Sequence, residues 1–407
     1  MRSRRLAIII SILLLFIITP PLLYNQYHVK PPIKPPNEIN VAFLSHYLAP
    51  DAIAFKNLIE RWNPSFQKMG FYVNVIDFDK ESILTTILSS KNSSIDIVVV
   101  TNFNFKAILP YLLPLNLTST EQFYEKAVHP FYNNGSLYAL PFHASFPILI
   151  YNKNYIIDSP KSFNQLLSIA KDFSKAHNLN SPTEYGLAIY SLEGRHSSLV
   201  FQSLYENLGG QIFITNSTIK FLSNETIESL LSTYTFLIEE KISPPEIMYL
   251  ESSVLNDEFI AEKFPIMIQW NYALYRLSNS IPEKFGIAPI PSYSMLSNSV
   301  GYLMAFGICK SSKDVSFSIK FLEELCNPKF LEGLIDTGFF PPIKGLSKIL
   351  EGNILDLEEK IFYENYKNCV NEKFSNKFYE TFSRYLVWYL EKKVSEKEFI
   401  KLISSIS

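Results

Sequence analysis

The chain has 407 residues, more than a single hydrophobic core usually supports, so two lobes or domains are expected. Hydrophobic residues make up 47% and charged residues 19%, a balance that excludes a disordered chain. The net charge of −2, with no basic stripe, argues against a nucleic-acid partner.

The amino terminus carries a membrane-targeting pattern. Arg2, Arg4 and Arg5 precede an uncharged apolar run from Leu6 to Thr19. Counted alone, the run has the length of a signal peptide; counted through residue 24, it approaches the roughly 20 residues that span a bilayer. Because no small-x-small cleavage site or lipid-accepting cysteine follows, an uncleaved anchor over residues 1–24 is favoured over a cleaved, secreted form. The positive end should stay in the cytoplasm, which places the rest of the chain outside.

Residues 25–37 are rich in proline and predict an extended spacer of polyproline character. Sequons for N-glycosylation also agree with an exported chain, although a chain rich in Asn and Ser yields some by chance. The sequons begin at Asn92, Asn116, Asn134, Asn216 and Asn224.

Strands alternate with helices after the spacer. Strands are expected at 38–44, 71–78 and 97–100, with helices at 55–66 and from 83. This alternation predicts a mostly parallel sheet, in which ligands gather beyond the carboxyl ends of the strands. The rule selects Ser45, His46 and Tyr47 after the first strand, and Thr101, Asn102 and Asn104 after the third.

Residues 134–153 predict a crossing between two packed bodies. A turn signal at Asn134-Gly135 opens the stretch, and the apolar run from Phe146 to Tyr151 suits a strand covered on both faces. Between them lies a small polar patch with His143 and Ser145. We interpret this patch as a hinge that also contributes to a ligand site.

The same stretch resembles a known family. G-x-L-Y-x-L-P at 135–141, a strand ending Y-N-K at 151–153, and P-K-S-F-x-x-L-L at 160–167 are similar to the sugar-binding class of extracellular solute-binding proteins of ABC transporters, which includes the maltose-binding protein. Phe163 stands where the family usually has Trp. The resemblance runs on through most of the chain, at 259–270 with Glu262 in place of the usual Gly, at 286–291 (G-x-A-P-x-P) and at 338–341 (G-x-x-P).

The resemblance implies an α/β, two-lobed periplasmic-binding-protein-like fold of type II, each lobe a mostly parallel sheet flanked by helices. The first lobe would comprise residues 38–143 with 288–328, and the second 144–287 with 329–407. Hinge crossings would lie near 143–145, 286–289 and 326–329.

Second-lobe candidates follow two predicted strands. After the strand at 186–190, the loop at 191–196 holds Glu193, Arg195 and His196, which can hydrogen-bond to hydroxyl groups and match the family's sugar loop by position. Trp270 closes the strand at 265–269, with Tyr272 just beyond. Stacking of Trp270 on a sugar ring is favoured over packing in the lobe core, which stays open as the alternative.

The remaining candidates come from the resemblance. Gly301 lies where the family approaches its ligand through glycine backbone, and Phe340 belongs to the G-x-x-P segment. Arg384 and Tyr385 fall where relatives supply another stacking aromatic.

Catalytic, cofactor and metal sites are not expected. The sequence contains no G-x-S-x-G, H-E-x-x-H, Walker or G-x-G-x-x-G motif, and its six histidines lack metal-ligand spacing. Cys309, Cys326 and Cys369 show no C-x-x-C spacing and are expected to be free, buried thiols.

The sequence therefore predicts a monomeric, membrane-anchored extracellular protein that captures a carbohydrate between two lobes and delivers it to an ABC permease. A polyamine or peptide binder of the same fold, and a surface adhesion protein that transports nothing, are the alternatives. The selected first-lobe loops hold none of the carboxylates that a cationic ligand would need, which favours a neutral polyhydroxylated ligand.

Overall fold

The computed structural model describes residues 37–44, 52–90, 92–116, 120–214, 219–293, 297–370 and 375–406. The predicted anchor, almost all of the spacer, and the candidates Ser45, His46 and Tyr47 lie outside these ranges. No helix within them is long and apolar enough to cross a membrane.

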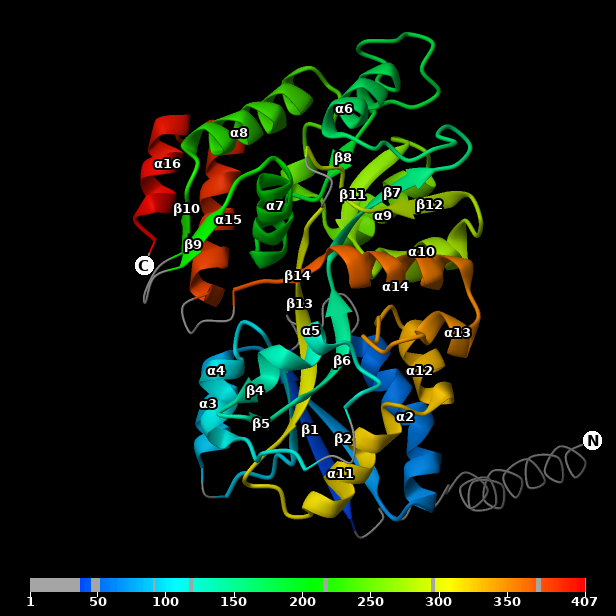
Figure 1. Ribbon diagram of the computed structural model, residues 1–407, viewed down its shortest axis with the longest axis vertical. Helices are drawn as coiled ribbons and strands as arrows, with labels where there is room; N and C mark the ends of the chain where they lie inside the picture. The colour runs from blue at the N-terminus through cyan, green and yellow to red at the C-terminus, as the bar shows by residue number, and fades with distance from the viewer. Residues whose placement is uncertain are drawn as a thin grey trace, which may run out of the picture.

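Two sheets lie one above the other along the long axis of the molecule (Figure 1). Within the described residues the first sheet has six strands, in the order β14-β13-β3-β1-β2 with β6 also paired to β13. These strands are β1 (Glu38–Leu44), β2 (Tyr72–Phe78), β3 (Ile97–Thr101), β6 (Leu140–Ser145), β13 (Ser299–Ile308) and β14 (Tyr366–Asn368). Neighbours β1, β2 and β3 are parallel, while β13 runs antiparallel to β3 and β6.

The second sheet has the order β12-β7-β11-β8. Its strands are β7 (Pro147–Asn152), β8 (Ala188–Ile189), β11 (Ile266–Trp270) and β12 (Phe285–Ala288). Only β8 and β11 are parallel among the described pairs, and β7 runs antiparallel to both of its neighbours. This sheet is therefore mixed instead of mostly parallel, because its central strand β7 runs opposite to β11 and β12.

Helices flank both sheets (Figure 1). Those of the first half of the chain are α2 (Ala52–Lys68), α3 (Glu81–Ser89), α4 (Phe105–Ile108), α5 (Glu125–Val128), α6 (Phe163–Asp172) and α7 (Arg195–Asn207). Those that follow are α8 (Asn224–Glu239), α9 (Ser252–Ile260), α10 (Ala273–Ser280), α11 (Val315–Glu324), α12 (Pro328–Ile335), α13 (Leu346–Leu350), α14 (Asn353–Asn365), α15 (Ser375–Leu390) and α16 (Glu396–Ser404). Short hairpins pair β4 (Tyr132–Asn133) with β5 (Ser136–Leu137), and β9 (Ile212–Ile214) with β10 (Ile219–Phe221).

The elements form where apolar residues recur at the right period. In α2 the side chains of Phe55, Leu58, Ile59 and Phe66 are buried on one face, as the spacing of three, four and seven residues predicts. All five residues of β3 are buried, as expected for a strand covered on both faces. Each large apolar side chain contributes roughly 1.5–3 kcal/mol when it leaves water.

The chain passes from the first sheet to the second at Phe146, between β6 and β7. Here β13 crosses so closely that a Cβ on Gly301 would lie 2.1 Å from the backbone oxygen of Ser145. No other residue fits that approach without a backbone shift. Gly301 is thus required by the packing of the hinge strands.

Of the predicted crossings, the one at 326–329 differs from the structure. β12 pairs with β7 in the second sheet through Ala288, so the chain returns to the first sheet between β12 and β13. Phe330 of α12 packs against Trp62 and Phe66 of α2, with ring centroids 5.0 and 6.4 Å apart. The chain therefore does not leave the first lobe at 326–329, and α14 is the later helix that reaches β12.

Candidate ligand-binding site

Aromatic rings gather on one side of the hinge strands, where β11, α7 and β13 meet. Trp270 ends β11, and Tyr272 stacks on it with centroids 6.2 Å apart and planes 5° apart. His196, in the first turn of α7, lies 4.9 Å from the Trp270 ring, and Tyr302 of β13 lies 5.6 Å from it.

The opposite wall of this cluster comes from the end of β3 and from α15. Phe103 contacts Tyr302 and Tyr379, with centroids 5.5 and 5.7 Å apart. The Arg195 guanidinium lies 5.2 Å from the Phe103 ring, a cation–π distance. We call Phe103, Arg195, His196, Trp270, Tyr272, Tyr302 and Tyr379 the aromatic face.

Hydrogen bonds fix several polar groups around the aromatic face. His196 Nε2 and the Tyr302 hydroxyl are 2.9 Å apart. Asn102 accepts from the Leu303 backbone N–H at 2.7 Å, and Asn104 accepts from the Thr101 backbone N–H at 2.7 Å. Burial raises the pKa of Tyr302 to about 12, so its phenol stays neutral.

The buried donors without a hydrogen-bond partner within the described part of the chain include Trp270 Nε1 on this face and Asn104 Nδ2, next to Phe103 in the sequence. Trp270 is 0% exposed and Asn104 1% exposed. An unsatisfied buried donor costs about 1–3 kcal/mol. Acceptor groups of a ligand, such as hydroxyl oxygens, would remove that cost.

The structure brings many of the predicted site residues together. Arg195, His196, Trp270 and Tyr272 all belong to the aromatic face, while Thr101, Asn102 and Asn104 border Phe103 at the end of β3. One detail was wrong: Arg195 and His196 lie in the first turn of α7, not in a loop. The sequence cannot show that α7 begins there, because Gly194 precedes it without a side-chain cap.

Three other predicted residues, Glu193, Arg384 and Tyr385, lie outside the aromatic face, on α15 or next to it. Arg384 and Glu193 form an ion pair of 3.3 Å, in which both side chains are about half exposed. Tyr385 packs against Trp388 with centroids 5.4 Å apart. Arg384 and Tyr385 thus lie outside the aromatic face, to which α15 contributes Tyr379, and their role in ligand binding stays a prediction.

His143 and Phe340 belong to the packing of the hinge. His143 is 2% exposed, and its Nδ1 accepts from the Phe340 backbone N–H at 2.8 Å. Burial lowers the pKa of His143 to about 3, so the ring is neutral. Phe340 packs on Phe146 and Phe362. Ser145 is the strand partner of Tyr302 and stays at the edge of the aromatic face.

Sequence reasoning missed Phe103, Tyr302 and Tyr379. Tyr379 lies on the buried stripe of α15 with Phe382 and Leu386, at helical spacing that was readable from the sequence. Tyr302 had only its position in an all-apolar strand, which does not show which face it takes.

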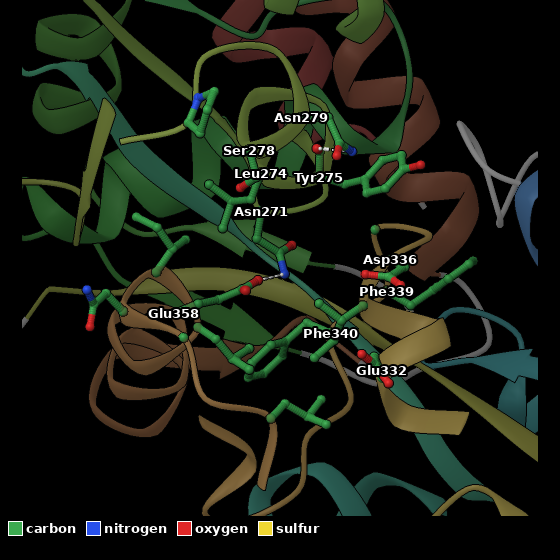
Figure 2. A pocket seen from close by; sticks show the side chains of 18 of the residues that line it. Asn271, Leu274, Tyr275, Ser278, Asn279, Glu332, Asp336, Phe339, Phe340 and Glu358 are labelled. Carbon is green, nitrogen blue, oxygen red and sulfur yellow. Dashed lines mark hydrogen bonds between the residues drawn. The ribbon is translucent and has the colours of Figure 1, made fainter. Parts of the chain in front are cut away.

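A cavity of about 500 Å³ lies on the other side of the hinge, between α10, α14 and the end of α12 (Figure 2). Asn271 Nδ2 donates there to Glu358 Oε1 at 2.8 Å. Glu358 is 8% exposed, and burial raises its pKa to about 8. We call this cavity the hinge-back pocket; nothing in the sequence indicated it.

The described residues contain no group of three or more His, Cys, Asp or Glu side chains able to hold a metal ion. The three cysteines are free; Cys309 and Cys369 are buried, and Cys326 is partly exposed.

Comparison with known proteins gives a family and a fold. The family model for bacterial extracellular solute-binding proteins matches residues 62–352. The maltotriose-binding protein of Pyrococcus abyssi (strain GE5 / Orsay) is 25% identical over 219 residues, which are 51% of this chain and 44% of that protein. The chain thus aligns with less than half of the length of that relative.

Solved structures agree on the fold. Maltose-bound MalE3 of T. maritima superposes with a TM-score of 0.76 at 17% identity, covering 90% of this chain and 98% of that one. The GacH receptor of Streptomyces glaucescens GLA.O gives 0.72 at 16% identity, covering 91% and 100%. A cyclo/maltodextrin-binding protein with maltotetraose gives 0.70 at 17% identity, covering 91% and 96%. The predicted two-lobed α/β fold is confirmed.

Proposed function

The chain belongs to the family of bacterial extracellular solute-binding proteins, and from this premise we propose that it binds a carbohydrate at the aromatic face and delivers it to an ABC permease. The family gives an extracellular or periplasmic location and a non-enzymatic role in transport. The maltotriose-binding relative and the maltose- and maltotetraose-bound structures support sugar as the solute class.

The observation that carries this proposal is the pairing of flat apolar rings with unsatisfied donors at one place. Sugars present C–H bonds on a ring face and hydroxyls around the rim, so they need an aromatic platform and separate hydrogen-bonding groups. Trp270 and Tyr272 offer the platform. Trp270 Nε1 and Asn104 Nδ2 offer donors that the described protein atoms leave unused.

A neutral ligand fits this face better than a cation does. The side chains that define it include no carboxylate, and the Arg195 guanidinium among them is already paired with Glu380 at 3.6 Å, so a polyamine would find no counter-charge on this face. Glu193, the acidic candidate nearest in sequence, is instead paired with Arg384 at the surface. A sugar is therefore proposed over a polyamine.

Ligand screening tests the proposal. Maltotriose, maltose, monosaccharides, spermidine and a mixed oligopeptide would each be added to a chain beginning at residue 37, and thermal unfolding followed. A ligand at one hundred times its Kd stabilises the native state by about 2.7 kcal/mol. A shift with a sugar alone supports the proposal. A shift with spermidine or peptide alone overturns it, and a response to none favours an adhesion role.

The ligand must also act at the aromatic face. Trp270→Phe should weaken the sugar response, whereas Trp388→Phe should leave it unchanged, because Trp388 lies beside Tyr385 outside this face. Equal effects of the two substitutions would place the site elsewhere.

Tethering to the membrane is a further part of the proposed function. Residues 6–24 would remain as an uncleaved anchor, and exposed sequons at Asn92, Asn134 and Asn224 would carry glycans on a monomeric protein. Full-length protein should then keep its first residues, partition with membranes, and shift in mobility on deglycosylation. A mature amino terminus beyond Tyr24 would exclude the anchor.

A further inference from the structure

The hinge-back pocket is separate from the aromatic face. In Figure 1, α7 and α15 lie on one side of β13, while α10, α14, α13 and α12 lie on the other. The pocket lies on this second side, lined by Asn271, Leu274 and Tyr275 above and by Phe339 and Phe340 below (Figure 2). Its volume of about 500 Å³ is that of a small-molecule site.

The charged side chains that line the hinge-back pocket are all acidic. Its lining contains the carboxylates of Glu283, Glu332, Asp336, Glu351 and Glu358, and no Lys, Arg or His among the described residues. None of the five forms an ion pair of 4.0 Å or less within the described ranges. The whole chain is almost neutral, so this bias is local.

Glu358 is the buried carboxyl group among the residues that line the pocket. It is 8% exposed, and its hydrogen-bond partner is the neutral amide of Asn271 at 2.8 Å. A buried carboxyl group either stays protonated or, once ionised, is paired with a cation, because burial of a charge without a counter-charge is costly. The other four carboxylates are exposed and lie at the rim.

A metal ion does not fit this arrangement. The carboxylates are spread along the pocket, and no three acidic, His or Cys side chains of the described residues converge as metal ligands would. The walls between them are Leu274, Tyr275, Phe339 and Phe340. One buried and four exposed acidic groups, with apolar and aromatic walls between them, suit an organic cation.

We propose that the hinge-back pocket binds an organic amine with an apolar body, its ammonium group paired with Glu358 and its body against Phe339 and Phe340. This second site lies across the hinge from the proposed sugar site and goes beyond the proposed transport function. It does not depend on sugar binding.

A matched pair of probes tests the charge requirement. 2-Phenylethylamine and 2-phenylethanol have the same body, and calorimetric titration at pH 8.5 would compare them. The amine should bind at least tenfold more tightly, because a charge-assisted hydrogen bond replaces a neutral one. Equal affinities, or no saturable binding of the amine, overturn the proposal.

Substitutions test the residues. Glu358→Gln keeps an acceptor for Asn271 but removes the charge, and should weaken the amine at least tenfold. Glu364→Gln, exposed on the same helix and outside the pocket, should not. Glu332→Gln combined with Asp336→Asn changes only exposed rim groups and should weaken the amine a few-fold without affecting folding. Unchanged affinity in both pocket variants overturns the assignment.

A pH series gives an independent readout. Burial raises the pKa of Glu358 to about 8, and the titratable groups that line the pocket with it are Glu283, Glu332, Asp336, Glu351 and Tyr275. Amines stay protonated up to a pKa of roughly 10. Affinity should therefore rise between pH 6.5 and 8.5 as Glu358 ionises, and this rise should vanish in Glu358→Gln. A rise that persists in the variant contradicts the role of Glu358.

Discussion

The same two lobes form both sides of the hinge, but side chains fill the space between the lobes at the aromatic face, whereas a cavity remains at the hinge-back pocket. On the aromatic face Phe103 of the first lobe contacts Tyr379 of α15, Tyr302 of β13 contacts Trp270 of β11, and Trp270 is 0% exposed. On the other side lies a cavity of about 500 Å³. Rigid lobes that turn about shared strands close one side as they part the other. The structure thus has the geometry of a hinge closed at the aromatic face.

Different forces hold the two sides. The aromatic face is held by ring packing, whereas the hinge beside the pocket is held by polar bonds centred on Asn271. Asn271 accepts from the Phe146 backbone N–H at 3.0 Å, and donates to the Ala144 carbonyl at 3.1 Å and to Glu358 at 2.8 Å. Trp270 and Asn271 are neighbours in the chain, so one short segment contributes both to the ring packing of the aromatic face and to the polar bonds of the hinge.

The largest expected effect is that of Trp270→Ala. Truncating a buried aromatic costs roughly 3–5 kcal/mol of folding free energy, and losing the stacking platform should weaken sugar binding at least tenfold, where tenfold is about 1.4 kcal/mol. Chemical denaturation and calorimetric titration with the sugar found by screening measure the two effects. Lower stability with unchanged affinity would make Trp270 a core residue only and remove the stacking role.

Asn271→Ala should come next, because it breaks the polar side of the hinge. It leaves the Phe146 N–H and the Ala144 carbonyl without their side-chain partner, at about 1–3 kcal/mol for each buried group that stays unsatisfied. Asn279→Ala is the control, since Asn279 is an exposed residue of α10 and should change stability by no more than about 0.5 kcal/mol. Equal denaturation midpoints for the two variants would show that Asn271 does not hold the hinge.

The aromatic face was partly predictable from the sequence for a local reason. Trp270 ends an apolar strand, and the carboxyl end of such a strand faces the cleft in an alternating fold. Phe103 and Tyr379 required one further step of reasoning. Phe103 lies between the two selected residues Asn102 and Asn104, and Tyr379 lies on the buried stripe of α15. His143 and Phe340, which were predicted to contact the ligand, lie among the hinge strands and outside the aromatic face. Polarity and family position do not reveal which side of a crossing strand a side chain takes.

The hinge-back pocket could not be predicted. Its lining comes from α10, α12 and α14, which are distant in sequence, and its key residue Glu358 lies beside Glu359 in a helix. Two adjacent acids in a helix indicate a solvated surface unless their neighbours in space are known. The pocket is therefore a product of tertiary packing, and the crossing at 326–329 was misplaced for the same reason.

The pH dependence of stability separates Glu358 from the rest of the hinge. Its pKa is raised from 4.5 to about 8, so the stability that it contributes is fully present below pH 4.5 and is lost as pH rises through 8. His143 acts in the opposite sense: its pKa is lowered from 6.5 to about 3, so its contribution is present above pH 6.5 and is lost as pH falls toward 3. Denaturation curves from pH 4.5 to 8.5 should show the alkaline loss in the wild type and in Glu364→Gln, but not in Glu358→Gln. An alkaline loss of the same size in all three would assign it to another group.

Tyr302→Phe should have the smallest effect, and it acts on closure of the aromatic face. The substitution removes the contact between the Tyr302 hydroxyl and His196 Nε2, which joins β13 to α7, at about 0.5–1.5 kcal/mol. The ring packing on Phe103 and Trp270 remains, so folding should be nearly unchanged while the lobes part more readily. Ligand-free protein should then show a larger radius of gyration by small-angle scattering and faster sugar association. Tyr249→Phe is the control, because that hydroxyl bonds to Glu391 at the exposed surface of the second lobe. If the radius and the association rate of Tyr302→Phe match those of the control, opening of the aromatic face is governed by ring packing alone.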